Sequence, residues 1–275
     1  MKGFHDFLVY WLGKGYAYIF DKLASISQNI FDTGWFSDPF ILSMTENIQN
    51  AISGIAYTLM IIFFFVELID LVSQENLTDL PEEFIYRLFI KLSITRILIH
   101  YTTPLLTWIV DTTNYFMLEI PSITTTDAIL EKLLQSIDST IPLRGSNLFT
   151  NILVIIQQLL FGAGLALPLA IFALVVGAVA VLSYVRNIEL LILLTIAPIP
   201  FCFIPYGKTR DIPKKFILSF ASVALQGMIM LIAIGIIMAI LATTTSIWEW
   251  IILFVVLAVA VAKAGSWAKE CLGLG

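Results

Sequence analysis

Long apolar runs separated by short polar stretches dominate the chain. Because a helix rises about 1.5 Å per residue, roughly 20 apolar residues cross a hydrocarbon core of about 30 Å. The alternation of apolar and polar residues that is typical of strands is absent, which favours helices. The pattern therefore predicts an all-α, polytopic membrane helical bundle with five or six spans. The runs cover residues 48–71, 84–110, 152–182, 187–205, 216–241 and 248–264.

The N-terminal residues 4–30 have a different pattern, in which large apolar side chains recur at helical spacing and polar ones fill the other side. This predicts an N-terminal amphipathic helix that lies in the membrane interface. Packing of the helix on the bundle explains the same pattern equally well. The apolar positions are Phe4, Leu8, Trp11, Leu12, Ile19, Leu23, Ile26 and Ile30.

Five segments follow from the alternation of apolar and polar stretches. The first is the amphipathic segment, the second a two-span hairpin, and the third a hydrophilic loop in which TDAILEKLLQSID reads as a short amphipathic helix. The fourth is a membrane core with a proline-broken segment, and the last is a cytoplasmic tail. Their ranges are 1–40, 41–110, 111–150, 151–265 and 266–275.

The least lipid-compatible part of the chain is residues 184–215, which combine charges and prolines within an apolar run. Arg186 and Glu189 are three residues apart on a helical start, so they are expected to pair. Pro198 and Pro200 remove backbone donors and obstruct the preceding turn, and lipid cannot satisfy the carbonyls that this frees. The segment is therefore expected to be buried in protein or to line a path. Six spans result if it crosses the membrane, and five if it turns back.

A short basic cluster follows these prolines and is formed by Lys208, Arg210, Lys214 and Lys215. The simplest interpretation is topological anchoring to anionic headgroups at the cytoplasmic face. A docking surface for an acidic partner, or a brief contact with nucleic acid, is the alternative. Positive charge in the tail likewise predicts a cytoplasmic C-terminus.

Two further features indicate contacts inside the bundle. The second run carries Arg87, Lys91, Arg96 and His100 at spacings that place them roughly on one face, which must contact protein, water or headgroups. Gln226 and Gly227 are neighbours in a later run, where a polar side chain beside a glycine is typical of a helix–helix contact.

Composition restricts the function further. The chain is 59% hydrophobic, and its net charge of -5 argues against a general nucleic-acid binder. Two histidines and two cysteines without metal-ligand spacing, and the absence of Walker A and GxSxG motifs, predict no cofactor, no metal site and no enzymatic activity. An ATPase that drives any transport would have to be another chain.

Several short motifs resemble the core of TrbL-like polytopic subunits of conjugative type IV secretion systems, especially those of Gram-positive mobile elements. VRNIELLILLTIAPIPF places Arg186 and Glu189 before an Ala-Pro-Ile turn at Pro198, and KKFILSFASVALQGMIMLI contains the Leu-Gln-Gly of Gln226 and Gly227. The resemblance covers most of residues 40–265 and implies a membrane scaffold or channel subunit. It also implies other secretion membrane subunits and a cytoplasmic ATPase as partners, with membrane lipid around the chain.

The leading hypothesis is thus a non-enzymatic subunit of a conjugative transfer channel in the cell membrane. It would belong to a multi-subunit complex, with possible homo-oligomers, and would contact the transferred DNA–protein substrate transiently. A secondary transporter or permease working alone is the rival, although no inverted repeat is evident in the sequence. A small accessory membrane protein is a third possibility.

Overall fold

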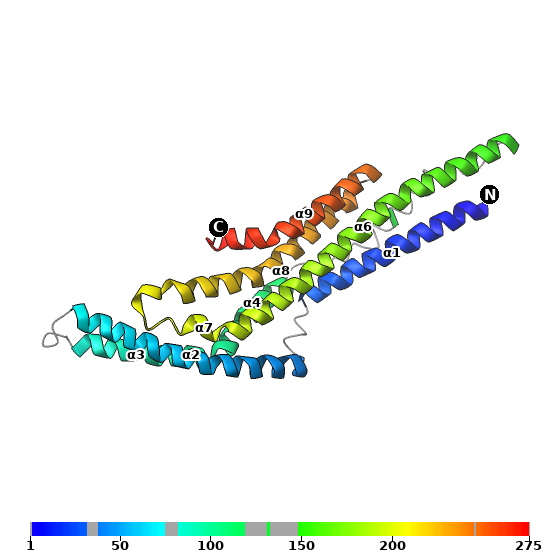
Figure 1. Cartoon of the computed structure of the whole chain (residues 1–275). Coiled ribbons are helices and arrows are strands. Elements are labelled where there is room, and N and C mark those ends of the chain that lie inside the picture. Colours follow the sequence, from blue (N-terminus) through cyan, green and yellow to red (C-terminus); the bar gives the residue numbers. More distant parts are fainter. Residues whose placement is uncertain are drawn as a thin grey trace. The chain divides into compact units, whose positions relative to one another are not determined.

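A computed structural model describes residues 2–31, 38–74, 82–118, 131–132, 148–244 and 246–274. Every regular element within these ranges is a helix, which confirms the all-α class (Figure 1). The predicted short helix in the loop after residue 118 lies almost entirely outside the described residues. The helices are α1 (Lys2–Phe31), α2 (Pro39–Gln74), α3 (Glu82–His100), α4 (Thr102–Leu118), α6 (Leu148–Ile196), α7 (Pro198–Phe201), the 3-10 helix η2 (Gly207–Thr209), α8 (Asp211–Thr243) and α9 (Ile247–Cys271).

Four helical segments in the described part of the chain are long and apolar enough to cross a membrane: Pro39–Ser73, Ala166–Ile196, Gly207–Thr243 and Trp248–Cys271. The expected second span at 84–110 is instead divided between α3 and α4 at Tyr101. Pro104 explains this division in part, because it has no N–H to donate to the carbonyl of His100. The four segments make the chain a multi-pass membrane protein.

The sequence pattern indicated that a separate segment starts near Arg186. The structure shows instead that this region belongs to α6. Helix α6 continues without a break from Leu148 to Ile196, with Pro168 inside it. Its length of about 74 Å, at about 1.5 Å per residue, greatly exceeds a bilayer core. The break comes only at Ala197, immediately before Pro198 opens the four-residue helix α7. The first ten residues of the expected 187–205 segment are therefore the end of α6.

The described chain forms two compact units, each assembled from separate segments. The first unit comprises Met1–Phe31, Met117–Tyr184 and Ile229–Ala264. Within it, Phe20 of α1 packs on Phe172 of α6, whose ring stacks on Phe254 of α9 at a centroid distance of 4.0 Å. One face of α1 is buried in this unit. That burial supports packing of α1 on the bundle, and a position in the interface stays a prediction.

The second unit comprises Asp32–Phe116, Val185–Met228 and Gly265–Gly275. In it α7 packs against both α2 and α3. A polar contact also joins α4 to α2, where the Thr103 hydroxyl donates to Gln49 Oε1 at 2.6 Å. The buried core contains Ala56, Met60, Ile99, Leu106, Val110, Leu190, Leu194, Ala197, Phe201, Cys202, Phe220, Val223 and Ala224.

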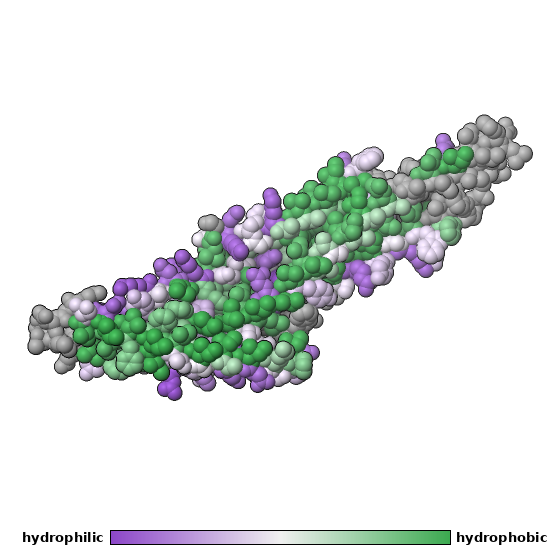
Figure 2. Space-filling model, viewed as in Figure 1, coloured by the Kyte–Doolittle hydropathy of each residue, from purple (hydrophilic) through white to green (hydrophobic). Residues whose placement is uncertain are grey.

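Much of the visible surface is hydrophobic, as Figure 2 shows. On α2 and α3 of the second unit, some large aliphatic and aromatic side chains are buried in the core, and many others lie at the surface and are about half exposed. Water-exposed proteins rarely carry such continuous apolar surface, whereas lipid tails are a matching solvent. The exposed set on these helices includes Ile61, Ile62, Phe65, Ile69, Ile90, Ile94 and Ile97.

Candidate functional site

The candidate site lies in the second unit and begins with a buried arginine. Arg186, near the end of α6, is 1% exposed. Its Nε donates to the carbonyl oxygen of Val223 at 3.1 Å, and Nη2 donates to that of Ala224 at 3.0 Å. Nη1 donates to Oδ1 of Asn187 at 3.5 Å. These acceptors provide the compensation that a guanidinium needs when it leaves water.

Gly227 makes this arrangement possible on the α8 side. A Cβ atom placed on Gly227 would lie 2.6 Å from Nη1 and 2.7 Å from Nη2 of Arg186, and closer still to Cζ. Because each helical carbonyl has a second lone pair, Val223 and Ala224 can accept from Arg186 without losing their bonds within the helix. The missing side chain at Gly227 thus opens the α8 backbone to the guanidinium.

Gln226, the neighbour of Gly227, contacts a different helix. A Cβ atom on Gly265 of α9 would lie 3.4 Å from the amide group of Gln226. Two adjacent residues of α8 therefore contact α6 and α9 within the second unit. Small residues on the partner helix allow this close approach of the backbones.

Tight turns follow the end of α6, and in each of them an N–H donates to the carbonyl three residues earlier. Cys202 N–H donates to the Ile199 carbonyl at 3.2 Å, Ile204 to Phe201 at 3.2 Å and Tyr206 to Phe203 at 3.3 Å. The Thr209 hydroxyl also donates to the Phe203 carbonyl at 3.0 Å. Pro198 occupies the first turn of α7, where no N–H is required, and it is buried. The helix breaks at the prolines, and the turns that follow satisfy the carbonyls of Ile199, Phe201 and Phe203.

Two carboxylates near the end of α2, those of Glu67 and Asp70, bind the turn that follows α7. We call this turn, residues 206–210, the basic turn. Glu67 Oε2 accepts from Gly207 N–H at 2.9 Å, and Glu67 Oε1 accepts from Lys91 of α3 at 3.3 Å. Asp70 Oδ2 accepts from Lys208 at 2.8 Å and from the Tyr206 hydroxyl at 3.5 Å. The α2 carboxylates therefore join α2, α3 and the basic turn.

A family model described as TrbL/VirB6 plasmid conjugal transfer like protein matches residues 19–198, about two thirds of the chain. The chain belongs to the TrbL/VirB6 family. No curated protein and no solved structure matches it. The TrbL/VirB6 match includes Arg186, Glu189 and Pro198 and ends before the basic turn and Gly227.

The other sequence-predicted residues of this TrbL/VirB6 member lie in different surroundings. Glu189 is exposed on α6, so it does not share the buried environment of Arg186. Pro200 is half-buried in α7. Arg210 lines a cavity of about 400 Å³ with Glu67, Leu71, Arg87, Leu88, Ile90 and Lys91. Lys214 and Lys215 are exposed at the start of α8.

Glu67 and Asp70 are the site residues that sequence reasoning missed. Their signal was present, because two carboxylates three residues apart at the end of an apolar run share one helix face. Their partners could not be read from the chain, since Gly207 and Lys208 follow 140 and 138 residues later.

The different surroundings of Arg186 and Glu189 give a test on a single helix. We expect Arg186→Ala to lower the free energy of unfolding by about 2–4 kcal/mol, because it leaves a cavity in the core. Glu189→Ala is expected to change it by less than about 0.5 kcal/mol, as for other exposed positions. Thermal unfolding of the two variants in detergent measures the difference. Equal losses would indicate a direct pair between the two side chains.

Proposed function

We propose that this TrbL/VirB6 member is a non-enzymatic scaffold subunit of a conjugative type IV secretion system of the Gram-positive mobile-element type. It would work in the cell membrane with other membrane subunits and a cytoplasmic ATPase, and would help a DNA–protein substrate across. Membership of the family is the observation that carries the assignment to a conjugation system. The substrate and the partners belong to the proposal.

The broken segment after α6 could either line a translocation path or brace the helices around it. The geometry of the second unit supports bracing. Ala197, Pro198, Phe201 and Cys202 are all buried in that unit. The carbonyls of Ile199, Phe201 and Phe203 accept bonds from the following turns and from Thr209. Arg186 connects α6 to α8. The α2 carboxylates connect α2 to α3 and to the basic turn. Such connections suit an element that must keep its form while a substrate passes.

The proposal extends to topology. The basic cluster Lys208, Arg210, Lys214 and Lys215 and the C-terminal tail would face the cytoplasm, as the positive-inside rule favours. Five spans would result if α3 and α4 together cross the membrane once in addition to the four segments described above. Six spans would have required residues 187–205 to cross separately, whereas the first ten of them belong to α6. The exposed Lys214 and Lys215 would then be available to anionic headgroups or to an acidic partner.

Deletion of the gene in a conjugative donor tests the function. We expect transfer to fall to the background of the assay while the other secretion proteins are still made, and the wild-type gene supplied in trans to restore it. Co-purification of the remaining membrane subunits and the ATPase with the tagged chain is the second readout. Unchanged transfer, or solute transport by the purified chain alone in liposomes, would contradict the proposal and favour the permease.

A further inference from the structure

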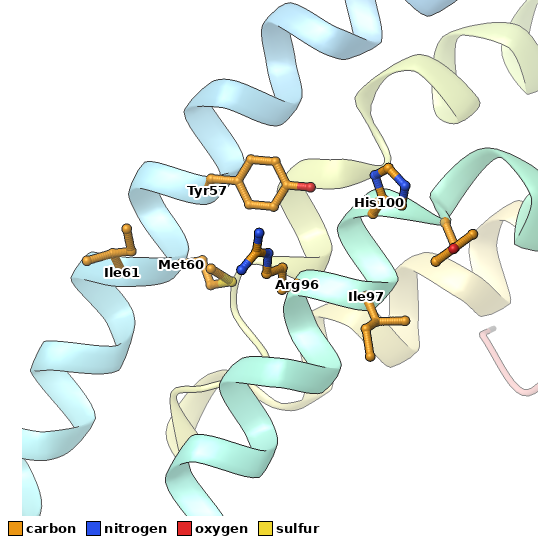
Figure 3. A pocket seen from close by; sticks show the side chains of 7 residues that line it. Tyr57, Met60, Ile61, Arg96, Ile97 and His100 are labelled. Atoms are coloured by element: carbon orange, nitrogen blue, oxygen red, sulfur yellow. The ribbon is translucent and has the colours of Figure 1, made fainter.

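A second polar site lies between α2 and α3, and its lining does not include Arg186. It is a cavity of about 550 Å³ within the second unit. Figure 3 shows Tyr57 and Met60 of α2 facing Arg96 and His100 of α3 across it. Ile61, Ile97 and Tyr101 complete the lining. Nothing in the proposed scaffold function uses these residues.

The cavity carries a positive charge, and the residues that line it include no carboxylate. Arg87 pairs with Glu83 at 3.8 Å and Lys91 pairs with Glu67 at 3.3 Å, so two cations of α3 have carboxylate partners. Within the described ranges no ion pair involves Arg96. His100 lies one turn further along the same face and adds a ring N–H donor. A cation beside lipid-facing helices needs an anionic partner or water.

The rest of the lining points to an amphiphile rather than to a free ion. Ile61 and Ile97 are about half exposed and continue the apolar surface that α2 and α3 present to lipid. The Tyr57 hydroxyl points toward His100 (Figure 3). The rings of His100 and Tyr101 meet edge to face at 4.8 Å. Tyrosine is enriched at headgroup depth because it is apolar in body and polar at its tip.

We propose that this cavity binds the phosphate group of an anionic phospholipid. Arg96 supplies the charge and can donate two N–H bonds to phosphate oxygens, and His100 and Tyr57 supply further donors. The acyl chains lie along the exposed isoleucines of α2 and α3. Basic pockets between membrane helices are suited to such headgroups. The net charge of -5 and the apolar wall argue against nucleic acid as the occupant.

The proposal does not depend on conjugative transfer, so binding by the purified full chain in detergent tests it separately. The probe is dioctanoyl phosphatidylglycerol, with dioctanoyl phosphatidylcholine, inorganic phosphate and a single-stranded oligonucleotide as competitors. We expect Arg96→Gln to raise the Kd for phosphatidylglycerol about tenfold, the equivalent of one lost charged hydrogen-bonding group. His100→Gln and Tyr57→Phe, which change size little, are expected to weaken binding in the same direction by less.

Arg87→Gln is the matched control, because it removes the same charge from the same helix outside this cavity. It is expected to leave the Kd unchanged. Equal losses in Arg87→Gln and Arg96→Gln would mean general attraction to α3 and would overturn the site. Equal affinity for phosphatidylcholine, or displacement of the lipid by inorganic phosphate or by the oligonucleotide, would overturn the lipid assignment.

Discussion

Gly227→Ala is expected to disrupt the second unit, although alanine is normally the better helix former. The new methyl group would occupy the position of the Arg186 guanidinium, with both terminal nitrogens within 2.7 Å. Arg186 would have to withdraw from the carbonyls of Val223 and Ala224 while staying buried. Breaking the compensation of a buried charge lowers stability by about 3–5 kcal/mol. The midpoint of thermal unfolding in detergent and the transfer frequency of donor cells measure the effect.

Gly235→Ala is the matched control for this change, because it lies on the same helix with no neighbouring atom within 4 Å of the added Cβ. There the better helix propensity of alanine should raise stability by about 0.5–1 kcal/mol. The two substitutions therefore differ in sign. A similar response from both would show that the guanidinium does not depend on the space at Gly227.

Glu67→Ala is also expected to destabilise the second unit, at the end of α2. Glu67 is 15% exposed and serves two donors at once, the Lys91 ammonium and the Gly207 N–H. Its removal would leave a partly buried cation and a backbone donor without this partner, which corresponds to a loss of about 2 kcal/mol. We also expect the basic turn to lose its fixed position, so limited proteolysis after Lys208 or Arg210 should become faster in Glu67→Ala.

Asp70→Ala removes a carboxylate one turn along the same helix and provides the comparison. The Lys208 side chain that Asp70 contacts is 67% exposed, so water replaces the lost partner. Surface ion pairs of this kind contribute about 0–1 kcal/mol. If Asp70→Ala were as harmful as Glu67→Ala, simple loss of charge at the end of α2 would account for both results, and the contact with Gly207 would not be decisive.

The residue types of the site were readable from the sequence, and their partners were not. An arginine and a glycine inside apolar runs are conspicuous, and the prolines correctly predicted a break. Arg186, however, bonds to a backbone carbonyl 37 residues later, and backbone acceptors leave no trace in the pattern of side chains. Pairing Arg186 with Glu189 was the natural local inference, and tertiary packing gave the guanidinium other acceptors.

The boundaries of the helices were harder to predict for a related reason. Arginine, asparagine and glutamate at 186–189 interrupt the hydropathy pattern but not the helical backbone, so α6 continues through them to Ile196. Conversely, the second apolar run looks continuous, yet it divides at Tyr101. Hydropathy reports the solvent that side chains prefer, whereas helix ends depend on individual backbone hydrogen bonds.

The bond between Arg186 and α8 has a consequence for how the protein is made. The arginine leaves the ribosome 37 residues before Val223, the first of its carbonyl acceptors. During that interval its guanidinium has no acceptor on α8, and hydrocarbon is a poor environment for it. We expect helix α6 to reach its final depth only after the first half of α8 has been synthesised. We therefore expect biogenesis of this membrane protein to follow an order in which a later helix completes the insertion of an earlier one.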